Sequence, residues 1–584
     1  MRLQLGIFGL ALSLTSTVSA ASLDSITEGV SGAIVGVLAS AKADSPVPLR
    51  RSITELAAEA GPQWQALRSM SDRDVSHPES FFQIAGIHGR PFIEYNNAGA
   101  TSATSWGGYS AHVENLFIIW HRVYVSLFEQ VLVKQAKSLA AGYPENVRST
   151  YQKAADDLRA PYWDWALEPD LPSVILPETI TAKVATETGV VAKDIVNPLY
   201  TYIFPKETLN GKFGQFQPGE RIYRCSTTTQ ANNNLHNSSL KASLFDAFVR
   251  AKSFSDFSTY SEVGNSVEGV HNSVHLDAGC AGQFIDSEYS AFDPLFMLHH
   301  ANVDRLWAYW QSIHPEMSTF NGTYSGKSRF NSAEGTMITL DSPLQPFRQV
   351  NGEWHTSSTV NDIKVLGYAY QGLEYWTKSA AEMQASALKT PSENTGSSTV
   401  SSSTAAETSS PLTTSSSQPG HGACIAPSTT TSMAARAHAA LKVRAKGSYK
   451  RFYAGIAVDV AYLPVRPCQI EIFLDKRRAG SMAIMKMPER GVVHDSISLK
   501  DAIASAKLGG VADDELLRRI QTRISVNLRK PDGGSISVTE LSGLKVEVEV
   551  VEMVAASSDL ELPTVIKSDK HVVLDKSVSG SAAQ

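Results

Sequence analysis

A long serine- and threonine-rich stretch divides this chain and most constrains how it can fold. Seventeen of the thirty residues from 391 to 420 are serine or threonine, and no aromatic residue occurs between Trp376 and Tyr449. Such a segment cannot bury enough apolar surface to offset its conformational entropy. We therefore predict a disordered linker over residues 388–432, of the composition typical of O-glycosylated stalks, between two separate domains.

The part before the linker carries helical periodicity. Between Glu114 and Ala141, apolar residues recur at intervals of three and four, which predicts an amphipathic helix. Asp293-Pro294 opens a second helix of the same kind. Because 584 residues exceed what one hydrophobic core organises, we predict a mainly helical domain over residues 45–385.

After the linker the apolar period changes to two. Short alternating runs between turn residues are typical of a β-sandwich, so residues 433–560 are predicted to form a β-rich lid domain. One helix is expected within it at 513–523, and residues 561–584 are expected to be a disordered tail. The expected strands are 454–462, 470–474, 524–528, 535–538 and 546–551.

Residues 1–20 have the pattern of an export signal. Arg2 supplies a positive charge, Leu3 to Leu14 a short apolar stretch, and Val18-Ser19-Ala20 a small-residue cleavage site. No later segment approaches 18 uninterrupted apolar residues, the length of a membrane-spanning helix. The sequence therefore predicts a soluble, secreted protein without a membrane partner.

Other features agree with export. An even number of cysteines permits two disulfides, although the sequence does not fix their pairing. Asn237-Ser238-Ser239 and Asn321-Gly322-Thr323 are acceptors for N-glycosylation. A net charge of -6 and a pI near 6.2 give no reason to expect nucleic-acid binding, so the expected partner is a small molecule. The four cysteines are Cys225, Cys280, Cys424 and Cys468.

Six of the fifteen histidines fall into two clusters. His271 and His275 are four residues apart, so both imidazoles project from one helix face. His121 and His300 lie within apolar helices, where an unpartnered imidazole is costly to bury. Two helices from each half of the domain are expected to point three imidazoles apiece into the core of a four-helix bundle. The clusters are His88, His112 and His121, and His271, His275 and His300.

Ligands of this kind restrict the metal. Imidazole ligation suits copper, zinc, iron or nickel, and the absence of carboxylates argues against magnesium, calcium and di-iron carboxylate sites. Asn272 stands where the catalytic glutamate of an H-E-x-x-H metalloprotease belongs. A metalloprotease is therefore excluded.

The two blocks resemble the copper A and copper B signatures of the tyrosinase family, which is related to catechol oxidases and molluscan haemocyanins. The run from Asp293 to Asp304 fits the pattern D-P-x-F-φ-x-x-H-x-x-x-D at every fixed position. The resemblance covers residues 45–380 and includes Pro161-Tyr162-Trp163-Asp164-Trp165 and Tyr368-Ala369-Tyr370. It implies a binuclear type-3 copper site, with one copper on each histidine cluster.

The resemblance also implies roles for neighbouring residues. His299 faces elsewhere on its helix and is expected at the wall of the cavity. Phe296 is expected to pack against the ligand imidazoles. Leu276 stands at a position that controls access to the cavity in relatives, and its aliphatic side chain predicts moderate access.

Asp304 has two interpretations. It accepts a hydrogen bond that orients a ligand or anchors the bundle, or it forms a surface salt bridge to Arg305 or Arg122. A departure from the family lies at Ser110, where many fungal members carry a cysteine that is crosslinked to the second copper A histidine. That crosslink is impossible here, so His112 must be held by hydrogen bonds and packing, and faster copper exchange is expected.

The family's chemistry implies O2-dependent ortho-hydroxylation of monophenols and oxidation of o-diphenols to o-quinones. Glu268 and Asn272 resemble the pair thought to hold the water that deprotonates a monophenol, which favours monophenolase activity. The structural alternatives are a first-turn carboxylate stabilised by the helix dipole and an ordinary polar helix residue. Two other functions remain: a catechol or o-aminophenol oxidase without hydroxylase activity, and an O2 carrier like haemocyanin. A single unit without repeats argues against the carrier.

The C-terminal domain is expected to cover the copper cavity until an activating protease removes it, as in other family members. The alternative is an independent adhesion or stability module. Phe452 and Tyr453 are candidate plugs of the cavity because they are aromatic and near the domain start. The family also suggests a role in melanin or pigment biosynthesis.

Overall fold

The protein is described by a computed structural model. The predicted signal peptide, most of the predicted linker, Cys424 and the first residues of the predicted lid domain lie outside the described residues. The structure describes residues 45–59, 61–99, 106–187, 189–393, 447–558 and 560–578.

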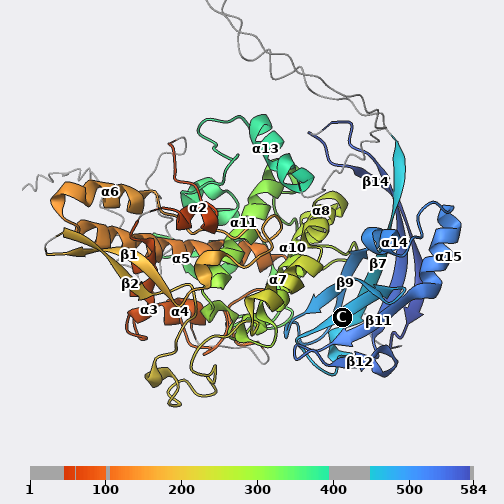
Figure 1. The fold of residues 1–584 in the computed structure, drawn as a ribbon, viewed down its shortest axis with the longest axis horizontal. Coiled ribbons are helices and arrows are strands. Elements are labelled where there is room, and N and C mark those ends of the chain that lie inside the picture. The colour runs from red at the N-terminus through yellow and green to blue at the C-terminus, as the bar shows by residue number, and fades with distance from the viewer. Residues whose placement is uncertain are drawn as a thin grey trace, which may run out of the picture.

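The first part of the chain is a helical domain built around α5 (Leu116–Ala141), which packs against α3 (Gln63–Asp72) and α11 (Leu295–Ile313) (Figure 1). Helix α5 is long and apolar enough to cross a membrane, but its whole apolar window is buried inside the protein. It is apolar all round because it is the core helix of the domain. The other helices of this domain are α2 (Ile53–Ala57), α4 (Phe81–Gly86), α6 (Glu145–Asp156), α7 (Thr228–Asn237), α8 (Leu240–Arg250), α9 (Phe254–Ser258), α10 (Val267–Gly279), α12 (Ser357–Val360) and α13 (Ala380–Glu393).

Polar side chains start α10 and α11, two of the helices that carry clustered histidines. Ser266 Oγ accepts a hydrogen bond from the first turn of α10. Asp293 Oδ1 accepts from Leu295 N at the start of α11 (2.9 Å), so the start expected at Asp293-Pro294 agrees with the structure. Small antiparallel hairpins surround the helices: β1 (Thr179–Thr186) with β2 (Gly189–Val196), β3 (Tyr324–Ser325) with β4 (Met337–Ile338), and β5 (Pro343–Arg348) with β6 (Trp354–Thr356).

The helical domain extends further than the sequence indicated. Helix α13 continues to Glu393, past the predicted domain end at 385 and into the predicted linker. It packs against α11, and its Ala387 and Leu388 are buried. These apolar residues lie just before the serine- and threonine-rich stretch, so composition alone places the domain boundary too early.

The C-terminal domain contains two four-stranded antiparallel sheets within the described residues, with strand orders β10-β7-β13-β14 and β12-β11-β8-β9. Buried side chains of both sheets, such as Ile456 and Ile472, form one core, so the sheets pack as a sandwich. The expected helical domain followed by a strand-rich domain is confirmed. The elements are β7 (Ser448–Asp459), β8 (Cys468–Leu474), β9 (Arg477–Ile484), β10 (Val492–Ser498), α14 (Lys500–Ser505), α15 (Asp513–Arg523), β11 (Ile524–Arg529), β12 (Ser535–Ser537), β13 (Leu544–Val554) and β14 (Thr564–Asp575).

The disordered tail predicted at 561–584 is wrong for residues 564–575. Strand β14 occupies Thr564–Asp575 and pairs with β13 at the edge of the sheet. Its side chains are mostly exposed or half-buried, and polar residues interrupt its apolar alternation. An edge strand of this kind carries a weak sequence signal.

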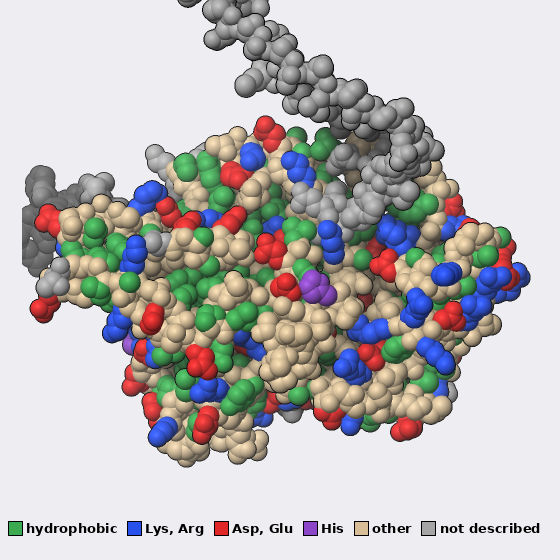
Figure 2. Space-filling view, in the orientation of Figure 1, with side chains coloured by type: hydrophobic (Ala, Val, Ile, Leu, Met, Phe, Trp, Pro, Cys, Tyr) green, Lys and Arg blue, Asp and Glu red, His purple; other side chains and the backbone are tan. Residues whose placement is uncertain are grey.

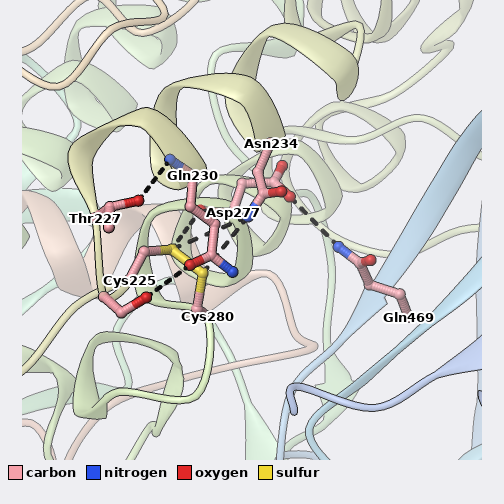
Figure 3. Close-up of a disulfide and its surroundings, with 8 residues drawn as sticks. Cys225, Thr227, Gln230, Asn234, Asp277, Cys280 and Gln469 are labelled. Carbon is pink, nitrogen blue, oxygen red and sulfur yellow. Dashed lines mark hydrogen bonds between the residues drawn. A yellow bond between two sulfur atoms is a disulfide. The ribbon is translucent and has the colours of Figure 1, made fainter. Parts of the chain in front are cut away.

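The two domains are in direct contact. Helices α8 and α10 lie beside the sheets of the C-terminal domain (Figure 1), and the buried Arg250 of α8 pairs with Glu549 of β13 (2.6 Å). A disulfide between Cys225 and Cys280 closes the end of α10. Beside it, Gln469 of β8 donates a hydrogen bond to Asp277 of α10 at 3.4 Å (Figure 3). The helix that carries two of the clustered histidines is therefore also a docking surface for the C-terminal domain.

Candidate metal centre

The clustered histidines lie together in the helical domain, in two groups within which the ligand-capable atoms lie within 4.8 Å of one another. His88, His112 and His121 form the first group. His271, His275 and His300 form the second, with His299 beside them. On the face shown in Figure 2, histidine reaches the surface only in small patches, because all of these side chains except that of His112 are fully buried.

The first group comes from one helix and two loops. His121, on α5, donates its Nδ1–H to the carbonyl of Phe117 one turn earlier (2.7 Å). His88 lies in the turn after α4, where its Nδ1 is 3.0 Å from the carbonyl oxygen of Ser287. His112 lies in the irregular segment before α5. The expectation of two ligand-bearing helices from this half is therefore wrong.

The loops that carry these two histidines make close backbone contacts at neighbouring glycines. A Cβ on Gly89 would lie 2.6 Å from the carbonyl oxygen of Glu288, and one on Gly108 would lie 2.4 Å from the carbonyl oxygen of His88. Both distances are far inside van der Waals contact. Glycine is thus required where the His88 loop passes Glu288 and where the His112 loop passes His88.

The second group is carried by α10 and α11. His275 donates its Nδ1–H to the carbonyl of Phe284 (2.7 Å). The Nδ1 of His271 is 2.9 Å from Oδ1 of Asn272. The Nε2 atoms of His271 and His300 approach to 3.1 Å. Each supported imidazole therefore turns its Nε2 toward the centre of the group.

The two groups adjoin each other. The rings of His121 and His300 stack with their centroids 4.2 Å apart. Phe296 stacks on His300 at 4.2 Å and meets His88 edge-on at 4.9 Å, so it packs between imidazoles of both groups. Two metal ions held here would be close neighbours.

Burial keeps the five fully buried imidazoles of the two groups neutral. It lowers the pKa of His275 to about 3. Burial, together with neighbouring imidazoles, also holds the pKa of His88, His121, His271 and His300 well below the ordinary value. A neutral imidazole keeps the lone pair that a metal ion requires.

The arrangement of the nitrogens fits a metal site. His88 donates its Nδ1–H to the carbonyl oxygen of Ser287, so its Nε2 carries a lone pair. This Nε2 lies 3.2 Å from Nε2 of His112. Nε2 of His121 is buried and has no hydrogen-bond partner among the described residues. Lone pairs that converge in this way need a cation between them, since an unpaired buried polar atom costs free energy. Two sets of imidazoles without a carboxylate ligand suit copper.

Glu268 supports His112 in the absence of a thioether crosslink. The hydroxyl of Ser110 is buried and unpartnered among the described residues. The Oε1 of Glu268 is 3.3 Å from Nδ1 of His112 and accepts a hydrogen bond from Val113 N at 2.8 Å. Its Oε2 accepts from Thr259 Oγ1 at 2.5 Å. The carboxylate thus connects the second half of the domain to the His112 loop.

Asp304 anchors the bundle. Its buried carboxylate accepts hydrogen bonds from Arg50 (2.9 Å), Arg122, Tyr368 (2.6 Å) and Tyr370 (2.7 Å). Burial alone would raise the pKa of Asp304, but the two guanidinium groups and the Tyr368 hydroxyl hold it below its ordinary value. This network ties the segment around Arg50, α5, α11 and the Tyr368-Ala369-Tyr370 motif together.

We expect Asp304→Asn to destabilise the helical domain by about 3–5 kcal/mol, because it leaves the buried Arg50 and Arg122 without a full counter-charge. Urea unfolding followed by tryptophan fluorescence measures this. Asp72→Asn, which breaks the exposed pair of Asp72 with Arg68, serves as the control and should change stability by less than about 1 kcal/mol. Equal effects of the two substitutions would contradict the anchoring role.

The remaining neighbours of the site are also buried. The alternative pairing of Asp304 with Arg305 is wrong, since Arg305 binds Asp164 at 2.8 Å. The ring of His299 lies parallel to that of His271, with centroids 4.8 Å apart. Neither of its ring nitrogens has a hydrogen-bond partner among the described residues. His299 therefore borders the second group from the side.

The C-terminal domain closes the cavity above the histidines. Met485 packs on Leu276, beside His275, and Lys486 binds Asp286 at 2.6 Å. The cavity that remains measures about 10 Å³, which is the space of at most one water molecule. It is lined by His88, His112, Glu268, His271, Asn272, His275, Ser287, Ser290, Met485 and Met487.

The aromatic plugs expected from the sequence are wrong. Phe452 is part of the core of the C-terminal domain. The hydroxyl of Tyr453 donates to Asp246 of α8 (3.0 Å), away from the histidines. The side chains that reach the cavity belong instead to Met485 and Met487.

Sequence reasoning missed three kinds of functional group. Backbone carbonyls such as those of Phe284 and Ser287 carry no side-chain signal. Met485 and Met487 lie in the irregular segment after β9, where no strand alternation marks them. Tyr260, which contacts Asn272 (2.6 Å), gave no signal because its motif is not periodic.

Comparison with known proteins agrees with this geometry. A family model described as the common central domain of tyrosinase matches residues 78–313. The chain is 33% identical over 389 residues to a tyrosinase of Podospora anserina, covering 61% of this chain and 67% of the relative. It is also 33% identical over 399 residues to a tyrosinase of Neurospora crassa, covering 61% of this chain and 57% of the relative.

Solved structures share the whole two-domain fold. A structure of latent and active mushroom tyrosinase matches with a TM-score of 0.73 and 20% identity, covering 92% of this chain and 98% of that one. Apo-protyrosinase of Aspergillus oryzae matches with a TM-score of 0.64 and 19% identity, covering 92% and 97%. At this level of identity the likeness concerns the fold.

Proposed function

Because this chain belongs to the tyrosinase family, we propose that it uses O2 to ortho-hydroxylate monophenols and to oxidise o-diphenols to o-quinones. One observation carries the proposal: two adjoining sets of imidazoles, all fully buried except that of His112, turn their Nε2 atoms inward beneath one cavity. We assign one copper ion to His88, His112 and His121, and the other to His271, His275 and His300.

When bound, the two copper ions supply the redox chemistry that activates O2. The protein orients the imidazoles by fixing their Nδ1–H groups on carbonyl oxygens. It also supplies a base, because a phenol with a pKa of about 10 has to lose its proton to react at neutral pH. Glu268 and Asn272 line the cavity, and we assign to them the water that takes this proton.

We expect Glu268→Gln to lower monophenol hydroxylation about 100-fold and catechol oxidation less than about fivefold. The amide keeps the shape of the carboxylate but loses its basicity, and a catechol depends less on a positioned base. Oxygen uptake with tyrosine and with catechol, at matched copper content, measures the ratio. Asn272→Ala should shift the ratio in the same direction, whereas equal losses on both substrates would assign the pair a structural role.

Two alternatives are tested by the same measurements. A catechol or o-aminophenol oxidase would oxidise catechol and leave tyrosine unchanged. An O2 carrier would bind O2 reversibly without steady turnover. Hemocyanin 1 of Megathura crenulata is 28% identical over 56% of this chain, but the match covers only 8% of that much longer protein.

We also propose that the enzyme is held latent by its C-terminal domain and activated by proteolysis. A cavity of about 10 Å³ cannot admit a phenol ring, and the methionine side chains that close it belong to the C-terminal domain. Lys486, between them, is fixed by Asp286 (2.6 Å) of the helical domain. The competing role, a module that serves stability alone, makes the opposite prediction for activity.

Secretion is proposed on three observations. The N-terminal segment has the pattern of a signal peptide, the Cys225–Cys280 disulfide fits an oxidising compartment, and the acceptors Asn237 and Asn321 are exposed. The protein should accumulate in the culture medium and shift in mass after treatment with an N-glycosidase. Released o-quinones would feed a pigment such as melanin.

The deciding experiment is copper analysis of the purified protein, followed by oxygen consumption with tyrosine and catechol before and after limited proteolysis. Two copper ions per chain and turnover of both phenols are expected. A protein that binds no copper, or that oxidises neither phenol after cleavage, would contradict the proposed function.

A further inference from the structure

Tyr260 lies between the metal site and the C-terminal domain. It follows α9 in the helical domain, and its Oη is 2.6 Å from Nδ2 of Asn272. The same oxygen is 3.3 Å from the carbonyl oxygen of Ala483 on β9 of the C-terminal domain. Burial, together with the nearby Glu268, raises the pKa of Tyr260 well above its ordinary value, so the hydroxyl keeps its proton.

The direction of each hydrogen bond follows from the next one. The Ala483 carbonyl accepts only, so the Tyr260 hydroxyl donates to it. The Oη of Tyr260 therefore accepts from the amide nitrogen of Asn272, which leaves Oδ1 of Asn272 facing His271 at 2.9 Å. His271 must then carry its proton on Nδ1. Its Nε2 keeps the lone pair and points at the Nε2 of His300, 3.1 Å away.

His271 differs from the other ligands in what supports it. Backbone carbonyls support the Nδ1 atoms of His88, His121 and His275. A carbonyl oxygen can only accept a hydrogen bond, so it fixes the proton on Nδ1. The support of His271 is a side-chain amide, which has an acceptor and a donor end of nearly the same shape. If the amide turned over, its NH2 group would face Nδ1 of His271 and would favour the tautomer with a proton on Nε2. That tautomer has no lone pair for a metal ion.

We propose that Tyr260 is a positioning residue for His271, which fixes the amide of Asn272 and thereby presents the Nε2 of His271 to copper. The Ala483 carbonyl is the terminal acceptor of this relay, so the docked C-terminal domain helps to assemble the metal site that it covers. The inference rests on the proposed function, because it requires copper at His271.

The test is copper binding by the full-length protein. Metal-free wild type and Tyr260→Phe are titrated with Cu(I) in competition with a chromophoric chelator of known affinity. We expect Tyr260→Phe to weaken one of the two copper ions by about 10- to 100-fold, the cost typical of losing an outer hydrogen-bond partner of a ligand, and to leave the other unchanged. Circular dichroism of the metal-free proteins checks that both are folded.

Tyr453→Phe is the matched control. It removes a tyrosine hydroxyl from the same domain boundary, where Tyr453 donates to Asp246 at 3.0 Å, but it has no connection to a histidine ligand. Both copper affinities should equal those of wild type. An equal loss in the two variants would show that domain docking in general, and not this relay, affects copper, and would overturn the proposal.

Asn272→Asp provides a rescue. A carboxylate offers an oxygen to His271 in either orientation, so it does not need Tyr260 to fix its direction. The double variant Tyr260→Phe with Asn272→Asp should therefore recover copper affinity to within about threefold of wild type, whereas Asn272→Leu should not. Unchanged affinity in Tyr260→Phe, or failure of the rescue, overturns the relay alone. A wild type that binds no copper overturns the proposed function as well.

Discussion

His300→Ala is expected to bind one copper ion per chain instead of two and to oxidise catechol more than about 100-fold more slowly than wild type. Losing an outer hydrogen-bond partner of a ligand typically lowers metal affinity or activity about 10- to 100-fold. We expect a larger loss of activity here, because the ligand itself is removed. The Nε2 of His300 lies 3.1 Å from that of His271 and belongs to the second histidine group. His121→Ala should act in the same way on the first group. Metal analysis and oxygen uptake measure both effects.

His299→Ala is the control for this prediction. His299 precedes His300 on α11, is equally buried and lies in the same group, but its ring stacks flat on that of His271. The variant should lose stability because of the cavity that it creates, and should still bind two copper ions. Full copper content and full activity in His300→Ala would refute the ligand assignment, and loss of one copper ion in His299→Ala would make that residue a ligand.

The histidines themselves could be predicted from the sequence because local spacing fixes them. His271 and His275 share a helix face whatever the rest of the fold does, and both lie on α10. His88 could be singled out by its motif, but its setting could not, because its support is a carbonyl 199 residues further along the chain. Contacts of that range depend on the tertiary fold.

The same distinction applies to the fold. Helices α5, α11 and α15 have strong periodicity and were located within about two residues. Strand β9 begins with two arginines and contains a glycine, and β14 is an exposed edge strand, so neither shows clean alternation. Their place in the sheets comes from pairing with β8 and β13, which no local pattern reports.

The prediction that Phe452 or Tyr453 plugs the cavity is wrong for a related reason. An aromatic residue near the domain start is a compositional argument, but both residues lie within β7. Because successive side chains of a strand point to opposite sides, Phe452 packs in the domain's own core and Tyr453 contacts α8. The cavity is reached by the segment that follows β9, which the sequence did not identify as an element.

Removing the C-terminal domain is expected to raise catechol turnover at least about tenfold. The predicted linker would hold that domain at an effective concentration of about 1 mM. With an intrinsic docking affinity of about 10 μM, roughly 1% of molecules would be open, so release would raise the rate by up to about 100-fold. The truncated protein should end after Glu393 rather than near residue 385, because the earlier end would cut α13 and expose α11. Limited proteolysis of the full-length protein within residues 394–446 should give the same increase.

A substitution can distinguish a C-terminal domain that blocks the cavity from one that serves stability alone. Met487→Ala shortens a side chain that lines the cavity and should raise the turnover of small phenols in the uncut protein. Met482→Ala removes a methionine from the same domain, but one that is buried in the domain's own core, so it loosens the domain without opening the cavity directly. If the C-terminal domain blocks the site through its methionines, Met487→Ala should activate the enzyme at a temperature at which Met482→Ala does not. If the truncated, copper-loaded protein is folded and no more active than the full-length form, the C-terminal domain is a stability module, and the closed cavity does not limit access of the substrate.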